Sequence, residues 1–313
     1  MASSSFSSAS LLEKALARTY IADPKTALAA WLALELERPL LCEGPAGVGK
    51  TDLSRALAET LGRPLVRLQC YEGLDEAKAL YEWDYAKQML YTQLLRDTVT
   101  TQTAGATSVE AAVDKLAGAE SAFFGKRFLV ARPLLAALES DVPVVLLVDE
   151  VDRADPEFEA FLLEILAEQQ VTIPELGTIK AKHTPLVLLT TNATRDMTDA
   201  LRRRCLHTFL DYPPPSREVA ILELRVPGIA NDLAEALVRF VHAVRKIELL
   251  KHPSIAETID WARALLLLGA SALDRELVSS TLGVLLKHEE DRRTIAGELG
   301  GLLLGTGTGG RAT

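Results

Sequence analysis

One eight-residue segment constrains the fold of this chain more than any other feature of the sequence. Residues 44–51 read Gly-Pro-Ala-Gly-Val-Gly-Lys-Thr and match the pattern G-x-x-x-x-G-K-[ST]. The segment follows an apolar run at residues 38–43 that predicts a strand, and a helical pattern follows at residues 50–61. Glycines at such a junction let backbone N–H groups turn inward around phosphates, and the helix points its positive N-terminal end at them. A chance glycine-rich turn is the alternative, and the flanking strand and helix argue against it.

This loop predicts a binding site for ATP and Mg²⁺. The ammonium group of Lys50 is expected to reach the β- and γ-phosphates, and the hydroxyl of Thr51 is expected to bind Mg²⁺. The residues predicted to bind ATP are Gly44, Pro45, Ala46, Gly47, Val48, Gly49, Lys50 and Thr51.

The pattern of apolar runs predicts an α/β core with a parallel sheet flanked by helices. Residues 64–70 predict a second strand. The runs at residues 142–148 and 185–191 are almost continuously apolar, as strands buried on both faces of a parallel sheet are. After the prolines at 213–215 only helical patterns follow, at residues 216–224, 231–249, 255–268 and 271–286. A C-terminal all-helical domain, or lid, is therefore expected after the core.

The predicted boundaries are as follows. A disordered tail is expected at residues 1–10, the α/β core at 11–212, the helical lid at 216–298 and a glycine-rich tail at 299–313. Residues of about 71–128 fit neither pattern and are interpreted as an insertion, with a loop-like middle at Thr98–Ser108. The aromatic residues of this insertion, Trp83 and the Phe123-Phe-Gly125 segment among them, either grip a partner or form a small local core.

Polar side chains follow two of the predicted core strands. Asp149 and Glu150 end the run at 142–148, and Asn192 follows the run at 185–191. In sheets of this type ligands bind at the carboxyl ends of the strands. Asp149 is therefore predicted to hold Mg²⁺ through water, Glu150 to activate the attacking water, and Asn192 to position that water. The alternatives are solvated acids at a strand end and an ordinary capping asparagine.

Three consecutive arginines end the helical pattern at residues 198–204. At least one of Arg202, Arg203 and Arg204 is predicted to project from a subunit edge and to stabilise transition-state charge in a neighbouring subunit. The alternative is a solvated basic helix end that complements the helix dipole. A helical pattern at 155–169 and a hairpin at about 171–181 precede the Asn192 strand.

The order of these features resembles that of AAA+ ATPases. The hairpin and the insertion resemble the MoxR group, and residues 146–155 and 199–205 are most similar to the CoxD-like branch. The resemblance implies hydrolysis of ATP to ADP and phosphate, Asn192 as sensor 1, and Arg204 as an arginine finger with Arg203 as its partner. It also implies a six-membered homo-oligomeric ring that works as a chaperone motor with a von Willebrand factor A domain protein. The implied client is a metalloenzyme such as a molybdenum hydroxylase.

One position departs from the AAA+ pattern. Many lids carry a sensor-2 arginine at the start of the third lid helix, where this chain has Ala256 and Glu257. Either Arg263 or another lid residue substitutes, or the lid is coupled to the γ-phosphate differently.

Composition narrows the possible binding partners and cellular location of the protein. The formal net charge of -9 argues against a broad nucleic-acid surface, and the longest apolar runs are too short to span a bilayer. The serine-rich N-terminus does not read as a signal peptide, and the three cysteines form no metal-ligand pattern, so a cytoplasmic protein is expected. The competing interpretations are a nucleic-acid motor or loader and a nucleotide-gated scaffold with slow turnover.

Overall fold

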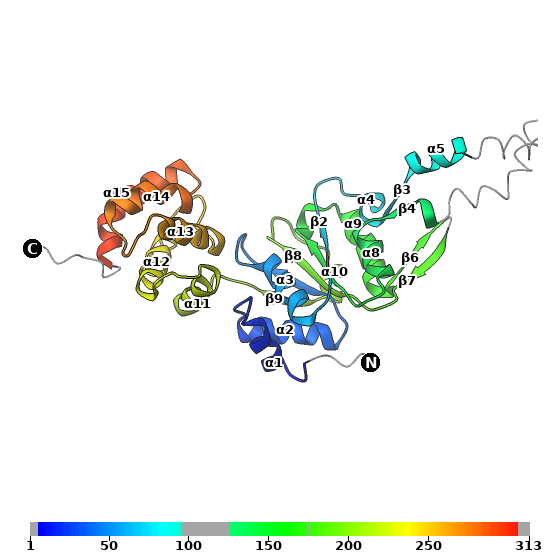
Figure 1. The fold of residues 1–313 in the computed structure, drawn as a ribbon, viewed down its shortest axis with the longest axis horizontal. Helices are drawn as coiled ribbons and strands as arrows, with labels where there is room; N and C mark the ends of the chain where they lie inside the picture. Colours follow the sequence, from blue (N-terminus) through cyan, green and yellow to red (C-terminus); the bar gives the residue numbers. More distant parts are fainter. Residues whose placement is uncertain (1–5, 95–125, 175, 306–313) are drawn as a thin grey trace, which may run out of the picture. The chain divides into compact units, whose positions relative to one another are not determined.

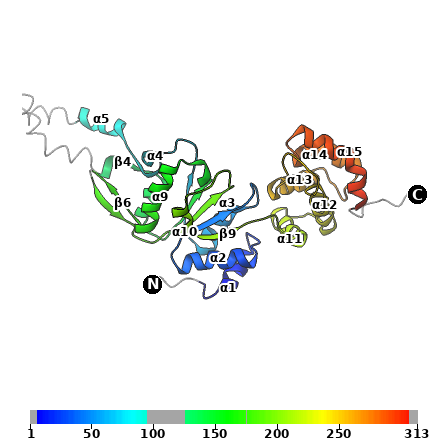
Figure 2. The same ribbon diagram turned by 180° about the vertical axis from the view of Figure 1, so that it is seen from behind.

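The computed structural model describes residues 6–94, 126–174 and 176–305 (Figures 1 and 2). The chain divides into two compact units. The first takes Met1–Leu32, Cys42–Leu61 and His207–Thr313, and the second takes Ala33–Leu41 and Gly62–Leu206.

A five-stranded sheet has the strand order β2-β5-β8-β1-β9. Its strands are β1 (Leu40–Glu43), β2 (Leu65–Gln69), β5 (Val145–Asp149), β8 (Leu186–Thr191) and β9 (Leu206–Phe209). β2 pairs with β5 and β5 pairs with β8, both in parallel. Every residue of β5 and β8 is buried, which explains why their sequences are almost continuously apolar. The predicted fold class, a parallel sheet flanked by helices, is confirmed.

Helices of the second unit build its core against the sheet. They are α4 (Glu76–Leu80), α8 (Pro133–Glu139), α9 (Pro156–Glu168) and α10 (Asp199–Arg204). α8 contacts β2 and β5 and buries Leu134 and Leu138 in one hydrophobic cluster with Leu146 and Phe158. This cluster fixes the position of β5, whose carboxyl end carries the predicted acidic residues.

Two small antiparallel strand pairs extend the second unit. β3 (Tyr81–Trp83), in the predicted insertion, pairs with β4 (Leu129–Ala131), and α5 (Tyr85–Leu94) and the short 3₁₀ helix η1 (Lys126–Phe128) lie between them in the sequence. β6 (Gln170–Ile173) pairs with β7 (Gly177–Lys180). The predicted loop at Thr98–Ser108 and the Phe123–Gly125 segment lie outside the described residues. The described aromatic rings pack locally, with Tyr81 edge-on to Trp83 and Tyr91 edge-on to Phe128.

The first unit contains α1 (Ala9–Leu16), α3 (Lys50–Leu61) and the C-terminal helices, while α2 (Pro24–Glu35) runs across the division between the units. The C-terminal helices are α11 (Pro215–Arg225), α12 (Asn231–Val244), α13 (Ile255–Leu267), α14 (Arg275–Leu285) and α15 (Glu289–Gly305). They share a hydrophobic cluster around Phe240 and Trp261, whose ring centroids are 5.3 Å apart. Among described residues from 215 to 305 no strand occurs, and no described helix of the chain is long and apolar enough to cross a membrane.

Helix ends differ from the sequence predictions by two residues or more at four places. α1 begins at Ala9, inside the predicted disordered tail, because the Ser8 side chain caps it and Leu12 and Leu16 are buried. α15 continues to Gly305, inside the predicted glycine-rich tail, because Leu299 is buried in the helical cluster. α12 ends at residue 244, five residues earlier than predicted, and α14 starts at residue 275, after the N-cap Asp274.

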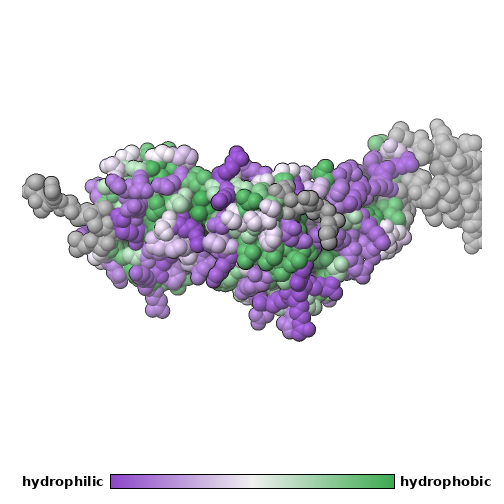
Figure 3. Space-filling model, turned by 90° about the horizontal axis from the view of Figure 1, so that it is seen from below, coloured by the Kyte–Doolittle hydropathy of each residue, from purple (hydrophilic) through white to green (hydrophobic). Residues whose placement is uncertain are grey.

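The surface drawn in Figure 3 is mixed, with hydrophilic side chains over much of it and hydrophobic ones between them. At the end of α13, Leu267 and Leu268 are exposed by 89% and 61%.

Candidate active site

The loop at residues 44–51 joins β1 to α3 in the first unit. Its backbone requires glycine: φ is +76° at Gly47 and +97° at Gly49, in the region that L-residues with a Cβ avoid. Space is equally limiting, since a Cβ on Gly44 would lie 2.0 Å from the carbonyl oxygen of Leu210. A Cβ on Gly47 would lie 2.3 Å from the Oγ of Ser254. The loop therefore has the tight, glycine-dependent course that a phosphate cradle needs.

Lys50 is buried at the first turn of α3 and reaches back over the loop. Its Nζ donates hydrogen bonds to the carbonyl oxygens of Gly44 (2.6 Å) and Pro45 (2.7 Å). The ammonium charge is thus held inside the loop, beside the N-terminus of a helix, and both favour a bound anion.

The start of α13 lies against the same loop. The Ala256 N–H donates to the carbonyl oxygen of Gly47 (3.3 Å). Glu257 closes a capping box with Ser254, so its side chain serves the helix end. Arg263 donates to the carbonyl oxygen of Arg225 (3.3 Å). At the position where the AAA+ pattern has an arginine, this chain therefore presents a backbone contact.

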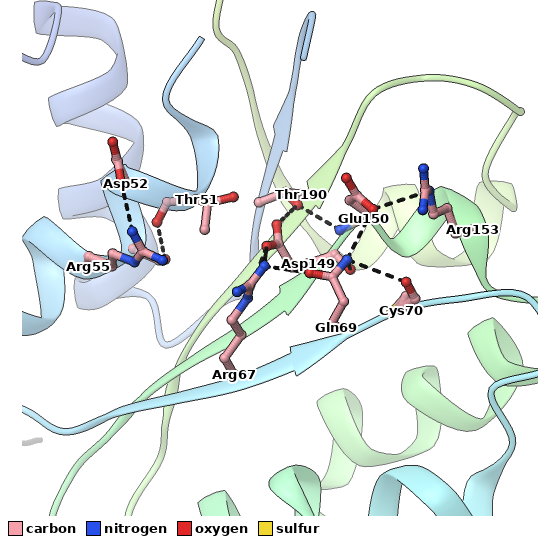
Figure 4. Close-up of polar contacts among 11 residues, drawn as sticks. Thr51, Asp52, Arg55, Arg67, Gln69, Cys70, Asp149, Glu150, Arg153 and Thr190 are labelled. Atoms are coloured by element: carbon pink, nitrogen blue, oxygen red, sulfur yellow. Dashed lines mark hydrogen bonds and ion pairs between the residues drawn. The ribbon is translucent and has the colours of Figure 1, made fainter. Parts of the chain in front are cut away.

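Asp149 ends β5 in the second unit with both carboxylate oxygens engaged (Figure 4). The hydroxyl of Thr190 donates to Oδ1 (2.5 Å), and Arg67 donates to Oδ2 through Nε (3.2 Å) and Nη2 (2.6 Å). The residue is only 3% exposed. Burying a carboxylate to this degree is costly unless it is paired and hydrogen-bonded, and these contacts provide both.

Glu150 is positioned by both its backbone and its carboxylate. Its φ of 55° is left-handed, and its N–H donates to the hydroxyl of Thr190 (2.8 Å). One carboxylate oxygen accepts from Gln69 (3.1 Å) and pairs with Arg153 (3.2 Å), as Figure 4 shows. Non-glycine residues in this backbone region cost about 1–3 kcal/mol and cluster at functional sites.

Asn192 follows β8 in a loop that Asp152 holds. Oδ2 of the buried Asp152 accepts the N–H of Asn192 (3.2 Å) and both the N–H (3.1 Å) and the hydroxyl (2.7 Å) of Thr194. Burial by itself raises the pKa of Asp152, but the hydrogen bonds from Thr194 and Asn192 outweigh it, so the pKa lies below its usual value. Asp152 is therefore a charged anchor for the loop that presents Asn192.

Arg203 and Arg204 are exposed at the end of α10. Their carbonyl oxygens accept hydrogen bonds from one guanidinium, that of Arg38, through Nη2 (2.9 Å) and Nε (3.3 Å) respectively. A cation at the carboxyl end of a helix satisfies its last carbonyls and complements its dipole.

Residues 39–205 match the family described as "AAA domain (dynein-related subfamily)", and this match spans more than half of the chain. The chain belongs to this AAA family. This AAA protein is similar to Chaperone protein ClpB of Corynebacterium diphtheriae. The two are 27% identical over 231 residues, which cover 70% of this chain and 22% of that protein. It is 29% identical over 149 residues to Chaperone protein ClpB 2 of Thermosynechococcus vestitus, covering 48% of this chain and 13% of that protein. The chain thus spans less than a quarter of these relatives.

A RuvB mutant from Thermotoga maritima aligns with a TM-score of 0.47 at 16% identity, covering 94% of this chain and 77% of that chain.

The predicted site residues of the AAA protein are divided between its two units. Those of the glycine-rich loop belong to the first unit, and Asp149, Glu150, Asn192, Arg203 and Arg204 belong to the second. Within the second unit the structure brings Asp149 and Glu150 together around one hydroxyl, that of Thr190.

Sequence reasoning missed the residues that hold these acids, chiefly Arg67, Gln69 and Thr190. Arg67 and Gln69 stand two apart on β2, so their side chains share a face, and Gln69 lies opposite Asp149 in the parallel register. Two polar residues at i and i+2 in an otherwise apolar strand were the available signal.

The remaining titratable groups do not suggest a separate metal centre. All three cysteines are buried and none is in a disulfide; burial, followed by the nearby carboxylate charges, raises the pKa of Cys70 to about 12. Across the described residues no cluster of three or more His, Cys, Asp or Glu side chains is arranged for a metal ion. Each of the two residues predicted to bind Mg²⁺, Thr51 in the first unit and Asp149 in the second, carries an oxygen donor of the kind that Mg²⁺ prefers.

Proposed function

We propose that this AAA protein is a Mg²⁺-dependent ATPase whose glycine-rich loop binds the phosphates of ATP and whose acids Asp149 and Glu150 serve Mg²⁺ binding and hydrolysis. The observation that carries the proposal is the pair of engaged acids, Asp149 and Glu150, within the same family domain as a glycine-dependent loop that buries a lysine. Loop N–H groups and Lys50 would bind the phosphates, as predicted from the motif.

The reaction assigned to this site is the transfer of the γ-phosphoryl group to water. Glu150 would accept a proton from the attacking water, whose oxygen bonds to the γ-phosphorus while the bond to the β-phosphate oxygen breaks, leaving ADP and phosphate. Asn192 would position the water, and Asp152 would fix the loop that presents Asn192. Asp149 and Thr51 would hold Mg²⁺, which supplies positive charge against the phosphates when it is bound.

We further propose a ring of subunits, with six as the expected number, in which Arg204 and its partner Arg203 act on the ATP of a neighbouring subunit. Both side chains are exposed at a helix end that Arg38 anchors. An arginine supplied in this way is worth about 10³–10⁵ in rate.

The proposed role of the ring is that of a chaperone motor that remodels a protein client in the cytoplasm. The matched relatives carry the name chaperone, which supports the class. The finer assignment, a MoxR-type protein of the CoxD-like branch with a von Willebrand factor A partner and a metalloenzyme client, rests on the sequence resemblance. A nucleotide-gated scaffold with slow turnover is the second candidate, because Asp149 and Glu150 are both held by cations in the structure.

ATP turnover per subunit, measured over a range of protein concentrations, tests the proposal. The specific activity of wild type should rise with protein concentration. The specific activity of Glu150→Gln should be lower by a factor of about 10²–10⁴, while the variant still binds nucleotide. Arg204→Ala should behave similarly, with Arg202→Ala as the control because it removes the same charge from the same helix end. Turnover independent of concentration, and equal in the two arginine variants, would contradict the ring and favour a monomeric switch.

A further inference from the structure

The Mg²⁺ ligand predicted from the sequence, Asp149, carries an arginine in this structure. Arg67 donates to Oδ2 of Asp149 through two N–H groups, and Thr190 occupies Oδ1. Figure 4 shows the guanidinium of Arg67 beside this carboxylate. Both lone pairs of Oδ2 are therefore engaged by Arg67, so a cation that approaches this oxygen competes with the guanidinium.

The two partners differ in their freedom to move. The Asp149 side chain is 4% exposed, whereas that of Arg67 is 44% exposed. β2, which carries Arg67, is the end strand in the order of the sheet, so a long side chain on it can turn into water without disturbing the core. The pair can therefore separate by moving Arg67 alone.

The released guanidinium also has another contact close by. Its Nη2 already donates to Oε1 of Gln69 (2.5 Å). When Arg67 leaves Asp149, none of its N–H groups is therefore left buried without a hydrogen-bond partner. One N–H group stays bonded to Gln69 and the others reach solvent.

We propose that Arg67 is a releasable counter-ion of Asp149, which it must leave when Mg²⁺ binds with nucleotide. Arg67 thereby sets how much Mg²⁺ the site requires. This inference rests on the proposed function, because it takes Asp149 as a metal ligand. The reason is electrostatic: a guanidinium and a divalent cation repel each other and compete for the same carboxylate oxygen. Without Mg²⁺, Arg67 keeps a buried carboxylate paired; with Mg²⁺, it is displaced.

A Mg²⁺ titration of nucleotide binding tests the assignment without turnover. The probe is a fluorescent, non-hydrolysable ATP analogue, mant-AMPPNP, bound to the full chain at fixed concentration while Mg²⁺ is varied. In Arg67→Gln the Mg²⁺ concentration for half-maximal binding should fall about three- to fivefold, the upper end of the effect that partly exposed ion pairs have. Arg67→Lys keeps the charge but loses the paired N–H contacts, so its midpoint should lie between the two.

Arg132→Gln is the matched control. Arg132 has the same side-chain exposure, 44%, and pairs with Glu82, which is not a predicted metal ligand. Its midpoint should stay within about twofold of wild type.

The outcomes separate the inference from the proposed function. Mg²⁺-dependent binding with the same midpoint in wild type and Arg67→Gln overturns the assignment of Arg67 alone. A wild type that binds the analogue equally well with and without Mg²⁺ overturns the proposed metal site, and the assignment with it. If Arg67→Gln does not fold, Arg67→Lys carries the test, and a midpoint equal to that of wild type refutes the competition.

Discussion

Replacement of Asp152 is the most direct test of how the Asn192 loop is held. One oxygen of this buried carboxylate accepts the N–H groups of Asn192 and Thr194 and the hydroxyl of Thr194. Hydrogen bonds to a charged acceptor contribute about 1.5–3 kcal/mol each, but Thr194 is exposed and its groups can turn to water. Asp152→Ala should therefore lower the free energy of unfolding by about 2–4 kcal/mol.

Asp152→Asn removes the charge of this side chain but keeps its shape, so it separates the two contributions to stability. The amide oxygen can still accept from the loop, so only the charge-assisted part of each bond is lost, and the expected cost is about 1–2 kcal/mol. Asp155→Ala is the control: Asp155 lies three residues further along, is exposed, and makes no side-chain cap to α9. Its change should stay within about 0.5 kcal/mol.

Two measurements check this prediction. Urea unfolding gives the free energies, and hydrogen–deuterium exchange of a peptide covering residues 190–197 reports the loop itself. Exchange at Asn192 and Thr194 should rise in both Asp152 variants and stay unchanged in Asp155→Ala. If Asp152→Ala costs no more than Asp155→Ala and leaves exchange unaltered, Asp152 does not anchor the loop.

The same contacts give the stability a pH dependence of known sign. The pKa of Asp152 is lower in the folded protein than its ordinary value, because the hydrogen bonds from Thr194 and Asn192 overcome burial. The folded state therefore binds the proton more weakly than the unfolded state. The stabilisation is fully present above the unfolded pKa of about 3.9 and is lost as the pH falls through the lowered folded pKa. Wild type should lose more stability on acidification to this range than Asp152→Asn does.

Three further changes test other contacts. Thr190→Val removes the hydroxyl that joins Asp149 to the backbone of Glu150, so unfolding free energy should fall by about 1–3 kcal/mol in urea, and an unchanged value would refute the bridge. Arg245→Met leaves the fully buried Glu218 without its bidentate partner and should cost about 3–5 kcal/mol by the same measurement; a cost below about 1 kcal/mol would contradict a buried, charged Glu218. Arg38→Ala should cost only about 0.3–1 kcal/mol because its contacts lie at an exposed helix end, yet it should lower ATP turnover severalfold. Turnover equal to that of wild type would mean that the helix end keeps its shape without Arg38.

The sequence was most informative where the chain is uniformly apolar or where backbone geometry demands glycine. β5 and β8 are buried over their whole length, so their composition alone predicts strands in a parallel sheet. The loop at 44–51 was recognisable because its glycines adopt positive φ, a requirement that few other residues meet. Helix ends were less predictable, since α15 continues through a glycine-rich stretch for the burial of Leu299, which depends on tertiary packing. The roles of the site residues stay predictions until the variants are measured.

The contacts around the acids were unpredictable for a topological reason. Asp149 and Glu150 take partners from β2, about 80 residues earlier in the chain, and only the order of strands in the sheet makes β2 the neighbour of β5. A sheet could place another strand there, and the same motif would then face different side chains. Because β2 is the end strand, it tolerates an arginine that a strand buried on both faces would not. The loop motif and the paired acids therefore predict the chemistry of the protein. The side chain that pairs with Asp149 comes instead from β2, a strand without a recognisable motif.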